Sequence, residues 1–167
     1  EYVDLYLIHW PAAGKSLDTW RALEKIYREG RSLAIGVSNY SVGELHEILT
    51  FSSIVPAVNQ VEFSPWVYDT ELQDFCRAHY IQLEAYSPLT KGEMLKDPCL
   101  ARIAEKYSKT PAQVLIRWAL EKGVVVIPKT SRKERLKENK EVFDFKLSHW
   151  DMEDLDSLDE VSCLIDR

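Results

Sequence analysis

The sequence predicts an α/β fold in which five parallel strands alternate with helices. Apolar runs of strand length are separated by amphipathic patterns of helix length, at the intervals of repeated strand–helix units rather than of hairpins. The runs are almost continuously apolar, so both faces of each strand are expected to be buried, as in a parallel sheet covered by helices. Polar groups close each run, and the active sites of such folds lie at the carboxyl ends of their strands.

The expected strands follow one another along the whole chain. They span Val3 to Ile8, Leu33 to Val37, Ala57 to Val61, Gln82 to Tyr86 and Val124 to Ile127. The polar groups at their ends are His9, Ser38 with Asn39, Asn59 with Gln60, Tyr86 with Ser87, and Lys129 with Thr130. We expect these groups to face a common ligand.

Helix starts are marked by capping boxes, in which a hydroxyl accepts from a free N–H and a Glu or Gln three residues later reaches back. Four pairs fit this pattern: Ser41 with Glu44, Thr70 with Gln73, Thr110 with Gln113, and Ser131 with Glu134. Two starts carry proline at the first helical position, Pro98 after Asp97 and Pro111 after Thr110. Further helices are expected from about Leu17 to Arg28, from Ala112 to Lys122, and from Asp151 to Asp159.

Composition indicates one soluble globular domain over residues 1–167, with 46% apolar and 29% charged residues. A net charge of -6 argues against a nucleic-acid partner, because phosphate binding needs a basic face. No apolar run approaches the roughly 20 residues of a membrane span. Cys76, Cys99 and Cys163 form neither a disulfide framework nor a thiolate metal site, which favours a cytoplasmic location. The chain begins at Glu1 and enters a strand at once, so we interpret it as a piece of a longer protein.

Glycine spacing separates the two parallel folds that fit this alternation, a small doubly wound sheet and part of a larger barrel. A dinucleotide-binding doubly wound sheet calls for G-x-G-x-x-G after a strand, and the six glycines never take that spacing. The P-loop pattern is absent as well. These absences favour the barrel.

Five segments carry a resemblance to the aldo-keto reductase family. They are Asp4 to Pro11 (DLYLIHWP), Ile35 to Tyr40 (IGVSNY), Val58 to Glu62 (VNQVE), Tyr86 to Leu89 (YSPL), and Ile127 to Thr130 (IPKT) with Arg135, Glu138 and Asn139. Each segment alone is a weak signal, but their order and spacing together are highly specific. The sequence therefore resembles this family almost from end to end.

The resemblance implies a (β/α)8 barrel that reduces aldehydes and ketones with NADPH, of which this chain supplies strands four to eight. The first three βα units would be missing, consistent with the roughly 250 residues of a full barrel. The family's proton-donating tyrosine and its partner aspartate and lysine would lie in that missing N-terminal part. The chain alone is then expected to be inactive, with the missing half of the barrel as its partner. Tyr68, Asp69 and Lys129 are residues of the same three types. Tyr68 and Asp69 open a helix, however, and Lys129 ends a strand, so none of them replaces a missing catalytic residue.

His9 is the one catalytic position present. At a strand end its imidazole can donate a hydrogen bond to a substrate oxygen and favour the charge that builds there. The alternative is a half-buried histidine that bonds to backbone, and the family resemblance favours the catalytic role. Trp10 and Trp66 are candidate apolar walls for the substrate. His46, His79 and His149 lack ligand spacing, so no metal site is expected.

Cofactor contacts are expected at three strand ends. Ser38, Asn39 and Gln60 match the donor and acceptor needs of a nicotinamide carboxamide, although turns and caps use the first two equally well. Tyr86 can stack on the nicotinamide or be an ordinary core aromatic. The segment from Ser87 to Gly92 resembles the family loop over the pyrophosphate, with Ser87 and Leu89 as contacts and Lys91 assisting by charge.

The charge run from Lys129 to Arg135 places four cations around an exposed helix N-terminus, which is suited to anions. A solvated basic helix face is the alternative for such a run. The resemblance implies that Lys129, Thr130 and Arg135 hold the 2′-phosphate of NADP(H), and that Glu138 and Asn139 meet the adenine. The identity of the small carbonyl substrate stays open. So does a second function, a noncatalytic nucleotide-binding or regulatory protein on the same fold.

Overall fold

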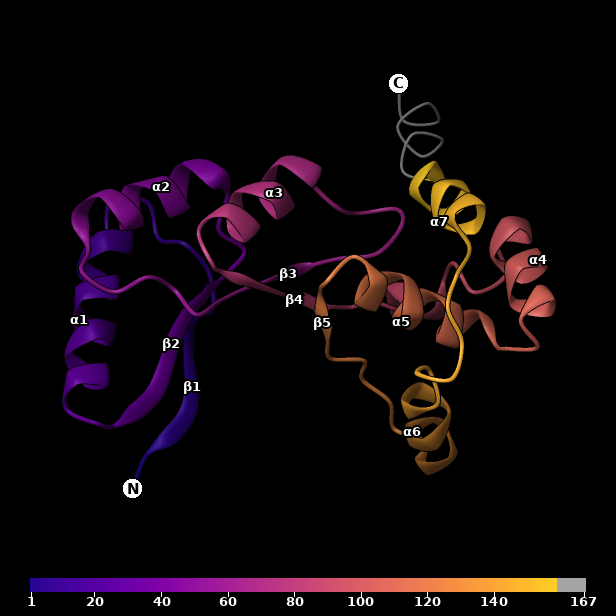
Figure 1. Ribbon diagram of the computed structural model, residues 1–167. Coiled ribbons are helices and arrows are strands. Elements are labelled where there is room, and N and C mark those ends of the chain that lie inside the picture. The colour runs from indigo at the N-terminus through magenta and orange to yellow at the C-terminus, as the bar shows by residue number, and fades with distance from the viewer. Residues whose placement is uncertain (159–167) are drawn as a thin grey trace. The chain divides into compact units, whose positions relative to one another are not determined.

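The computed structural model describes residues 1–158, so the end of the predicted last helix, Asp159, and Cys163 lie outside the described residues. The strands and helices alternate along the chain as expected from β1 to β4. A short 3-10 helix, η1 (Thr90–Gly92), and two α-helices separate β4 from β5, and two more helices follow β5 (Figure 1). The chain divides into two compact units, and β3 and β4 each contribute residues to both. The first unit holds residues 1–61 and 69–84, and the second holds residues 62–68 and the part of the chain from Ala85 onward.

Parallel strands form the sheet of the first unit. β1 (Val3–Ile8) pairs with β2 (Ser32–Ser38), and Leu7 stands opposite Gly36. β2 pairs in parallel with β3 (Val58–Glu62), and β4 (Gln82–Tyr86) follows β3 in the sheet order. The order β1-β2-β3-β4-β5 is that of the chain itself, as strand–helix repeats of a barrel require.

Three helices cover this sheet: α1 (Ser16–Arg28), α2 (Val42–Phe51) and α3 (Thr70–Ala78). Each of these helices buries one of its faces. Trp20 of α1 and Leu45 and Ile48 of α2 are fully buried, together with Ile35 and Val37 of β2. Glu24 of α1 is also buried, and its carboxylate accepts from the backbone N–H groups of Ser53 and Ile54. Helix α1 therefore fixes the loop that leads into β3.

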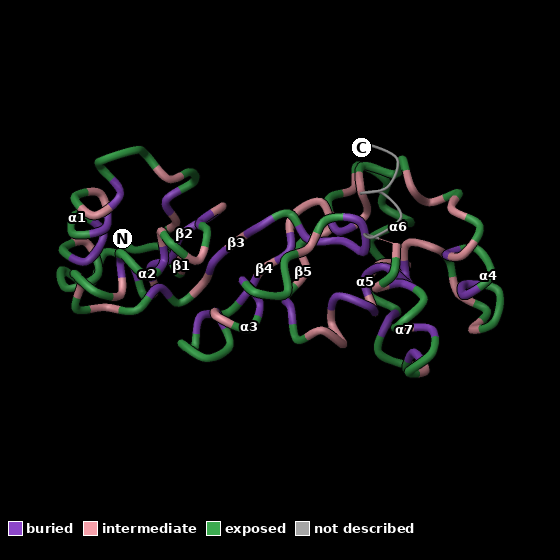
Figure 2. The backbone as a smooth tube through the Cα atoms, turned by 90° about the horizontal axis from the view of Figure 1, so that it is seen from above, coloured by how far each residue is buried: buried purple, intermediate pink, exposed green. Residues whose placement is uncertain are grey.

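The second unit is built around α5 (Pro111–Glu121), whose residues are buried over most of its length (Figure 2). α4 (Pro98–Lys106) packs against α5, and α6 (Lys133–Lys140) and the short strand β5 (Val125–Val126) contact it as well. α7 (His149–Asp156) packs on α4. The N–H of Ile127 donates to the carbonyl of Ala85, which attaches the β5 segment to the end of β4.

Two of the four predicted capping boxes form. Ser41 and Thr110 accept from the N–H groups of Glu44 and Gln113, whose side chains reach back to the cap backbone. The box predicted at Thr70 is wrong, because Asp69 caps α3 by accepting from the N–H of Leu72. A carboxylate one residue earlier is the better acceptor beside the positive end of a helix.

The box predicted at Ser131 is also wrong. α6 begins two residues later, at Lys133, and its cap position makes no side-chain hydrogen bond. The hydroxyl of Thr130 accepts from the N–H of Arg132 instead and holds the chain in a turn before the helix. The first N–H groups of α6 therefore have no side-chain cap.

The expectation that every strand is buried on both faces is wrong for the edge strands. Within residues 1–158, β1 and β5 stand at the two ends of the strand order, where no further strand covers them. Val3 and Tyr6 of β1 are each 48% exposed, and Val125 of β5 is 44% exposed. In β2, between β1 and β3, Ile35 to Ser38 are all buried, but Leu33 near its start is 56% exposed. None of the helices in this described part of the chain has the length and apolar character that a membrane span requires.

Candidate functional site

A hydrogen-bond network joins the strand ends of the first unit. The hydroxyl of Ser38 donates to the backbone carbonyl of Gln60 at 2.7 Å, and the backbone N–H of Asn39 donates to the same oxygen at 2.8 Å. The side-chain nitrogen of Asn39 donates to the carbonyl of His9 at 3.1 Å and lies 3.0 Å from the Ser38 hydroxyl. Polar positions selected from the sequence are thus brought together with the backbone of His9.

Asn39 adopts the left-handed backbone conformation, with φ of 62°. Asparagine tolerates this conformation better than most residues, and it turns the chain sharply after β2. With this turn, the backbone N–H of Asn39 donates to the Gln60 carbonyl while its side chain donates to the His9 carbonyl. Asn59, which also followed an apolar run, has another role: its amide is fully buried and pairs with the backbone of Tyr40.

His9 and Trp10 follow β1 and are exposed. Within residues 1–158 the His9 ring makes no hydrogen bond, so the alternative of a half-buried histidine held by backbone does not describe it. Its ring centroid lies 6.3 Å from that of Trp10. Trp10 is 59% exposed, whereas Trp66, the other candidate wall, is only 9% exposed. The imidazole is thus accessible to a ligand.

Tyr86 is half-buried at the end of β4. Burial raises the pKa of its phenol, and the negative charge of Glu62 raises it further. The hydroxyl therefore stays protonated near neutral pH. Tyr86 is not among the side chains that line the cavities described next.

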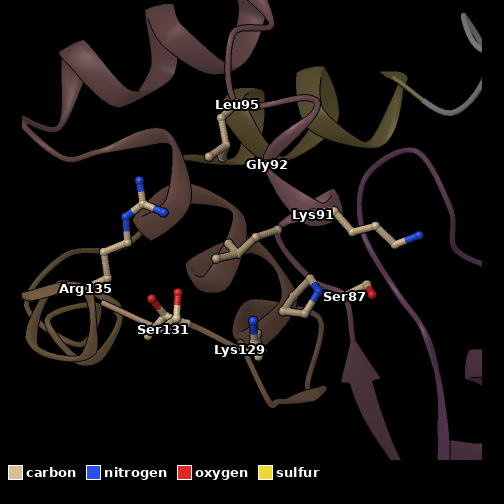
Figure 3. A pocket seen from close by; sticks show the side chains of 10 residues that line it. Ser87, Lys91, Gly92, Leu95, Lys129, Ser131 and Arg135 are labelled. Atoms are coloured by element: carbon tan, nitrogen blue, oxygen red, sulfur yellow. The ribbon is translucent and has the colours of Figure 1, made fainter. Parts of the chain in front are cut away.

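A cavity of about 380 Å³ lies in the second unit between the loop after β4 and the start of α6. Ser87, Leu89, Lys129, Thr130 and Arg135, all selected from the sequence, line it, together with Lys91 and Ser131. In Figure 3, Arg135 stands on the same side of the cavity as Ser131, Lys129 lies between Ser131 and Ser87, and the Lys91 ammonium is directed away from Arg135. Two segments far apart in the sequence thus share one cavity.

The charge of this cavity is positive. Its lining among the described residues includes Lys91, Lys129 and Arg135 and no carboxylate. In the described part of the chain none of these three cations forms an ion pair, although eleven pairs of Lys or Arg with Asp or Glu occur there. The uncapped N-terminus of α6 adds its own positive potential. Such a cavity favours an anion, and phosphate oxygens match the fork of Arg135.

An adjoining cavity of about 190 Å³ shares Leu89, Leu95, Lys129, Thr130 and Arg135 with the first. Glu138 and Asn139 line it, as does the start of α5 from Thr110 to Ala112. The Thr110 hydroxyl donates to the Glu138 carboxylate at 2.6 Å, so the cap of α5 also fixes that side chain. The lining of this cavity thus combines the cations Lys129 and Arg135 with the carboxylate of Glu138 and with apolar residues.

The loop that leads from β4 into the larger cavity has an unusual backbone. Ser87, Thr90 and Lys91 have φ of 50°, 48° and 56°, and Gly92 has φ of 91°. Left-handed non-glycine residues cost free energy and cluster where a ligand or a tight turn requires them. Bonds from Thr90 N–H to Ser87 O and from Gly92 N–H to Leu89 O hold the loop in place. These bonds give the loop a defined backbone conformation.

Sequence reasoning missed several lining residues and one polar partner. Leu95, Pro111 and Ala112 line the cavities without any polar signal that would have singled them out. The sequence pattern indicates Thr110 only as a helix cap. Glu84, whose carboxylate accepts from the Gln60 side chain at 2.6 Å, could have been found, because period-two alternation places it on the same strand face as Tyr86.

The sequence model of the aldo/keto reductase family matches residues 1–160. The chain belongs to this family. Among curated relatives, this chain is 52% identical over 160 residues to glyoxal reductase of Bacillus subtilis (strain 168). The alignment covers 96% of this chain and 58% of the relative. This chain is also 48% identical over 163 residues to 9,11-endoperoxide prostaglandin H2 reductase of Trypanosoma cruzi (strain CL Brener). That alignment covers 96% of this chain and 58% of the relative. The chain thus spans about three fifths of the length of the curated relatives it matches.

Two solved structures superpose closely on this chain. Apo Gox0644 superposes with a TM-score of 0.90 at 45% identity, covering 94% of this chain and 59% of the other. A single-site mutant of Gox0644 in complex with NADPH gives a TM-score of 0.90 at 44% identity, with the same coverage of each. The (β/α)8 barrel is therefore the fold family to which the described strands and helices belong.

Proposed function

We propose that the protein carrying this chain is an NADPH-dependent oxidoreductase that reduces aldehydes or ketones to alcohols. The cavity of the second unit is the observation that carries the proposal. Lys129 and Arg135, both without ion-pair partners in the described part of the chain, line it beside the uncapped start of α6. Two cations and free N–H groups are the donor set that a phosphate monoester requires, so the residues present fit the 2′-phosphate of NADPH.

The remaining cofactor contacts are assigned by their positions. Lys129, Thr130 and Arg135 hold the 2′-phosphate, and Glu138 and Asn139 of the adjoining cavity meet the adenine. Ser87 and Leu89 contact the pyrophosphate from the loop after β4. Ser38, Asn39 and Gln60 hold the nicotinamide carboxamide, and Tyr86 stacks on the nicotinamide ring. NADPH supplies the hydride when bound.

His9 serves the substrate in this proposal. Its exposed imidazole donates a hydrogen bond to the carbonyl oxygen, which orients that oxygen and stabilises the negative charge that develops on it. Asn39 positions the backbone of His9 through its bond to the carbonyl. Trp10, exposed next to His9, forms an apolar wall of the substrate site.

The proton donor is assigned outside residues 1–167. The chain covers 58% of its relative glyoxal reductase, and we propose that a preceding part completes the barrel and supplies the tyrosine, aspartate and lysine of the family. The 167 residues alone then bind nucleotide but do not reduce carbonyl compounds. Small aldehydes of the glyoxal type are the first substrates to test, and a cytoplasmic location belongs to the proposal.

The test is an assay of NADPH oxidation, followed by absorbance, on the whole protein with glyoxal, methylglyoxal and a ketone, alongside NADPH binding by fluorescence. We expect aldehyde-dependent oxidation, and its loss in His9→Ala with NADPH binding retained. Tight NADPH binding without turnover of any carbonyl compound would instead support the second candidate, a noncatalytic nucleotide-binding or regulatory protein. Absence of NADPH binding would overturn both.

A further inference from the structure

The side chains of Gln60 and Glu84 form a hydrogen bond between neighbouring strands. The Gln60 side-chain nitrogen lies 2.6 Å from Oε1 of Glu84, with Gln60 on β3 and Glu84 on β4. Both side chains are half-buried. A carboxylate can only accept, so the Gln60 group that faces Glu84 must be its NH2. The carbonyl oxygen of the planar amide then points away from Glu84.

The backbone of Gln60 is fixed independently of this contact. Its carbonyl accepts from the Ser38 hydroxyl at 2.7 Å and from the Asn39 N–H at 2.8 Å. The freedom left to Gln60 lies in its side chain, whose amide can turn by half a rotation and offer either a donor or an acceptor. A charged acceptor gives a stronger hydrogen bond than a neutral one and selects one of the two orientations.

We infer that Glu84 is a positioning residue that makes Gln60 a hydrogen-bond acceptor in the nicotinamide subsite. This inference rests on the proposed function. The nicotinamide carboxamide carries an NH2 donor, and an acceptor fixed in place recognises that donor. Glu84 itself touches no cofactor atom in this assignment. Its effect is selectivity: the site prefers a carboxamide to a group of similar size that lacks the N–H.

A cofactor analogue isolates this effect. In the reduced 3-acetylpyridine analogue of NADPH a methyl ketone replaces the carboxamide, so the carbonyl remains and the NH2 is lost. Glu84→Met keeps an unbranched side chain but cannot accept from Gln60. Glu84→Gln keeps an acceptor oxygen. Glu47→Ala, at an exposed position of α2, is the matched control for removing an acidic group from the same unit.

Dissociation constants of both nucleotides are measured by fluorescence titration on the whole protein, with circular dichroism as a check of folding. We expect Glu84→Met to weaken NADPH binding about tenfold and to change binding of the analogue by less than about twofold. Glu84→Gln should retain most of the preference, and Glu47→Ala all of it. If Glu84→Met does not fold, Glu84→Ala is measured in its place.

The outcomes separate the inference from the proposed function. Equal weakening of both nucleotides shows that Glu84 is merely structural, and unchanged binding of both shows that it does not orient Gln60. Either result overturns the inference while the proposed function stands. A wild-type protein that binds neither nucleotide overturns the proposed function and the inference with it.

Discussion

The side-chain amide of Asn39 donates to the backbone carbonyl of His9 at 3.1 Å and thereby ties the residue after β1 to the end of β2. The bond depends on the left-handed backbone of Asn39, with φ of 62°. One residue therefore performs two tasks, turning the chain and holding the segment that carries the exposed imidazole. The two tasks can be separated by substitution.

Asn39→Gly keeps the left-handed backbone and removes the amide, whereas Asn39→Ala removes the amide and adds strain. We expect both variants to weaken NADPH binding about tenfold, since each loses the hydrogen bonds to His9 and Ser38. Asn39→Ala should also unfold more easily than Asn39→Gly by about 1 kcal/mol. Urea titration and NADPH titration measure the two effects. Equal stability of the variants would show that the backbone conformation is not the constraint.

Arg135→Ala should lower affinity for NADPH by about tenfold or more and leave affinity for NADH within about twofold, because the guanidinium is assigned to the phosphate that distinguishes the two. Lys133→Ala is the control: Lys133 lies on the same helix but does not line either of the two cavities. Lys133→Ala should change the affinities for NADPH and NADH only slightly. Similar losses for NADPH and NADH would remove Arg135 from the 2′-phosphate site.

The strands were predictable because their signals are local. β1 and β4 have the predicted bounds, and the other strands differ from prediction by a single residue at either end. Capping was predictable where one hydroxyl competed alone, as at Ser41. It failed at α3, where Asp69 stands beside Thr70, because the outcome depended on a comparison of two acceptors.

The cationic cavity was predictable as a set of residues, since Lys129 to Arg135 are contiguous. Contacts between residues that are far apart in the sequence were not predictable. The pairing of Glu84 with Gln60 depends on the register between β3 and β4, which a strand pattern does not specify by itself. The exposure of Val3 and Tyr6 depends on β1 being an edge strand, which is a property of the sheet and not of the run.

Gly36→Ala should destabilise the first unit, because β2 passes too close to its neighbours for a side chain. A Cβ at this position would lie 2.6 Å from the Val58 carbonyl oxygen and 2.8 Å from Cδ2 of Leu7. Backbone cannot give way as a flexible side chain can, so we expect a loss of about 2–3 kcal/mol in the free energy of unfolding. Gly43→Ala is the control, since its Cβ would meet nothing within 4 Å and it lies in α2. That variant should be neutral or more stable by about 0.5–1 kcal/mol in the same urea titration.

Asp151 should make the docking of α7 on α4 sensitive to acid. Burial alone raises the pKa of its carboxyl, but hydrogen bonds from Lys106, Ser148 and Tyr107 outweigh burial and lower the pKa to about 2. A pKa lower in the folded than in the unfolded state stabilises the fold above about pH 4, and this stabilisation is lost as the pH falls toward 2. Asp151→Asn should therefore lower the free energy of unfolding by about 2 kcal/mol at pH 7 and by much less near pH 2.

Asp154→Asn, which removes an exposed ion pair with Arg102 from the same helix, should lower the free energy of unfolding little at either pH. A deficit of Asp151→Asn that stays constant between pH 7 and pH 2 in urea titrations would show that the charge of this carboxylate does not hold α7.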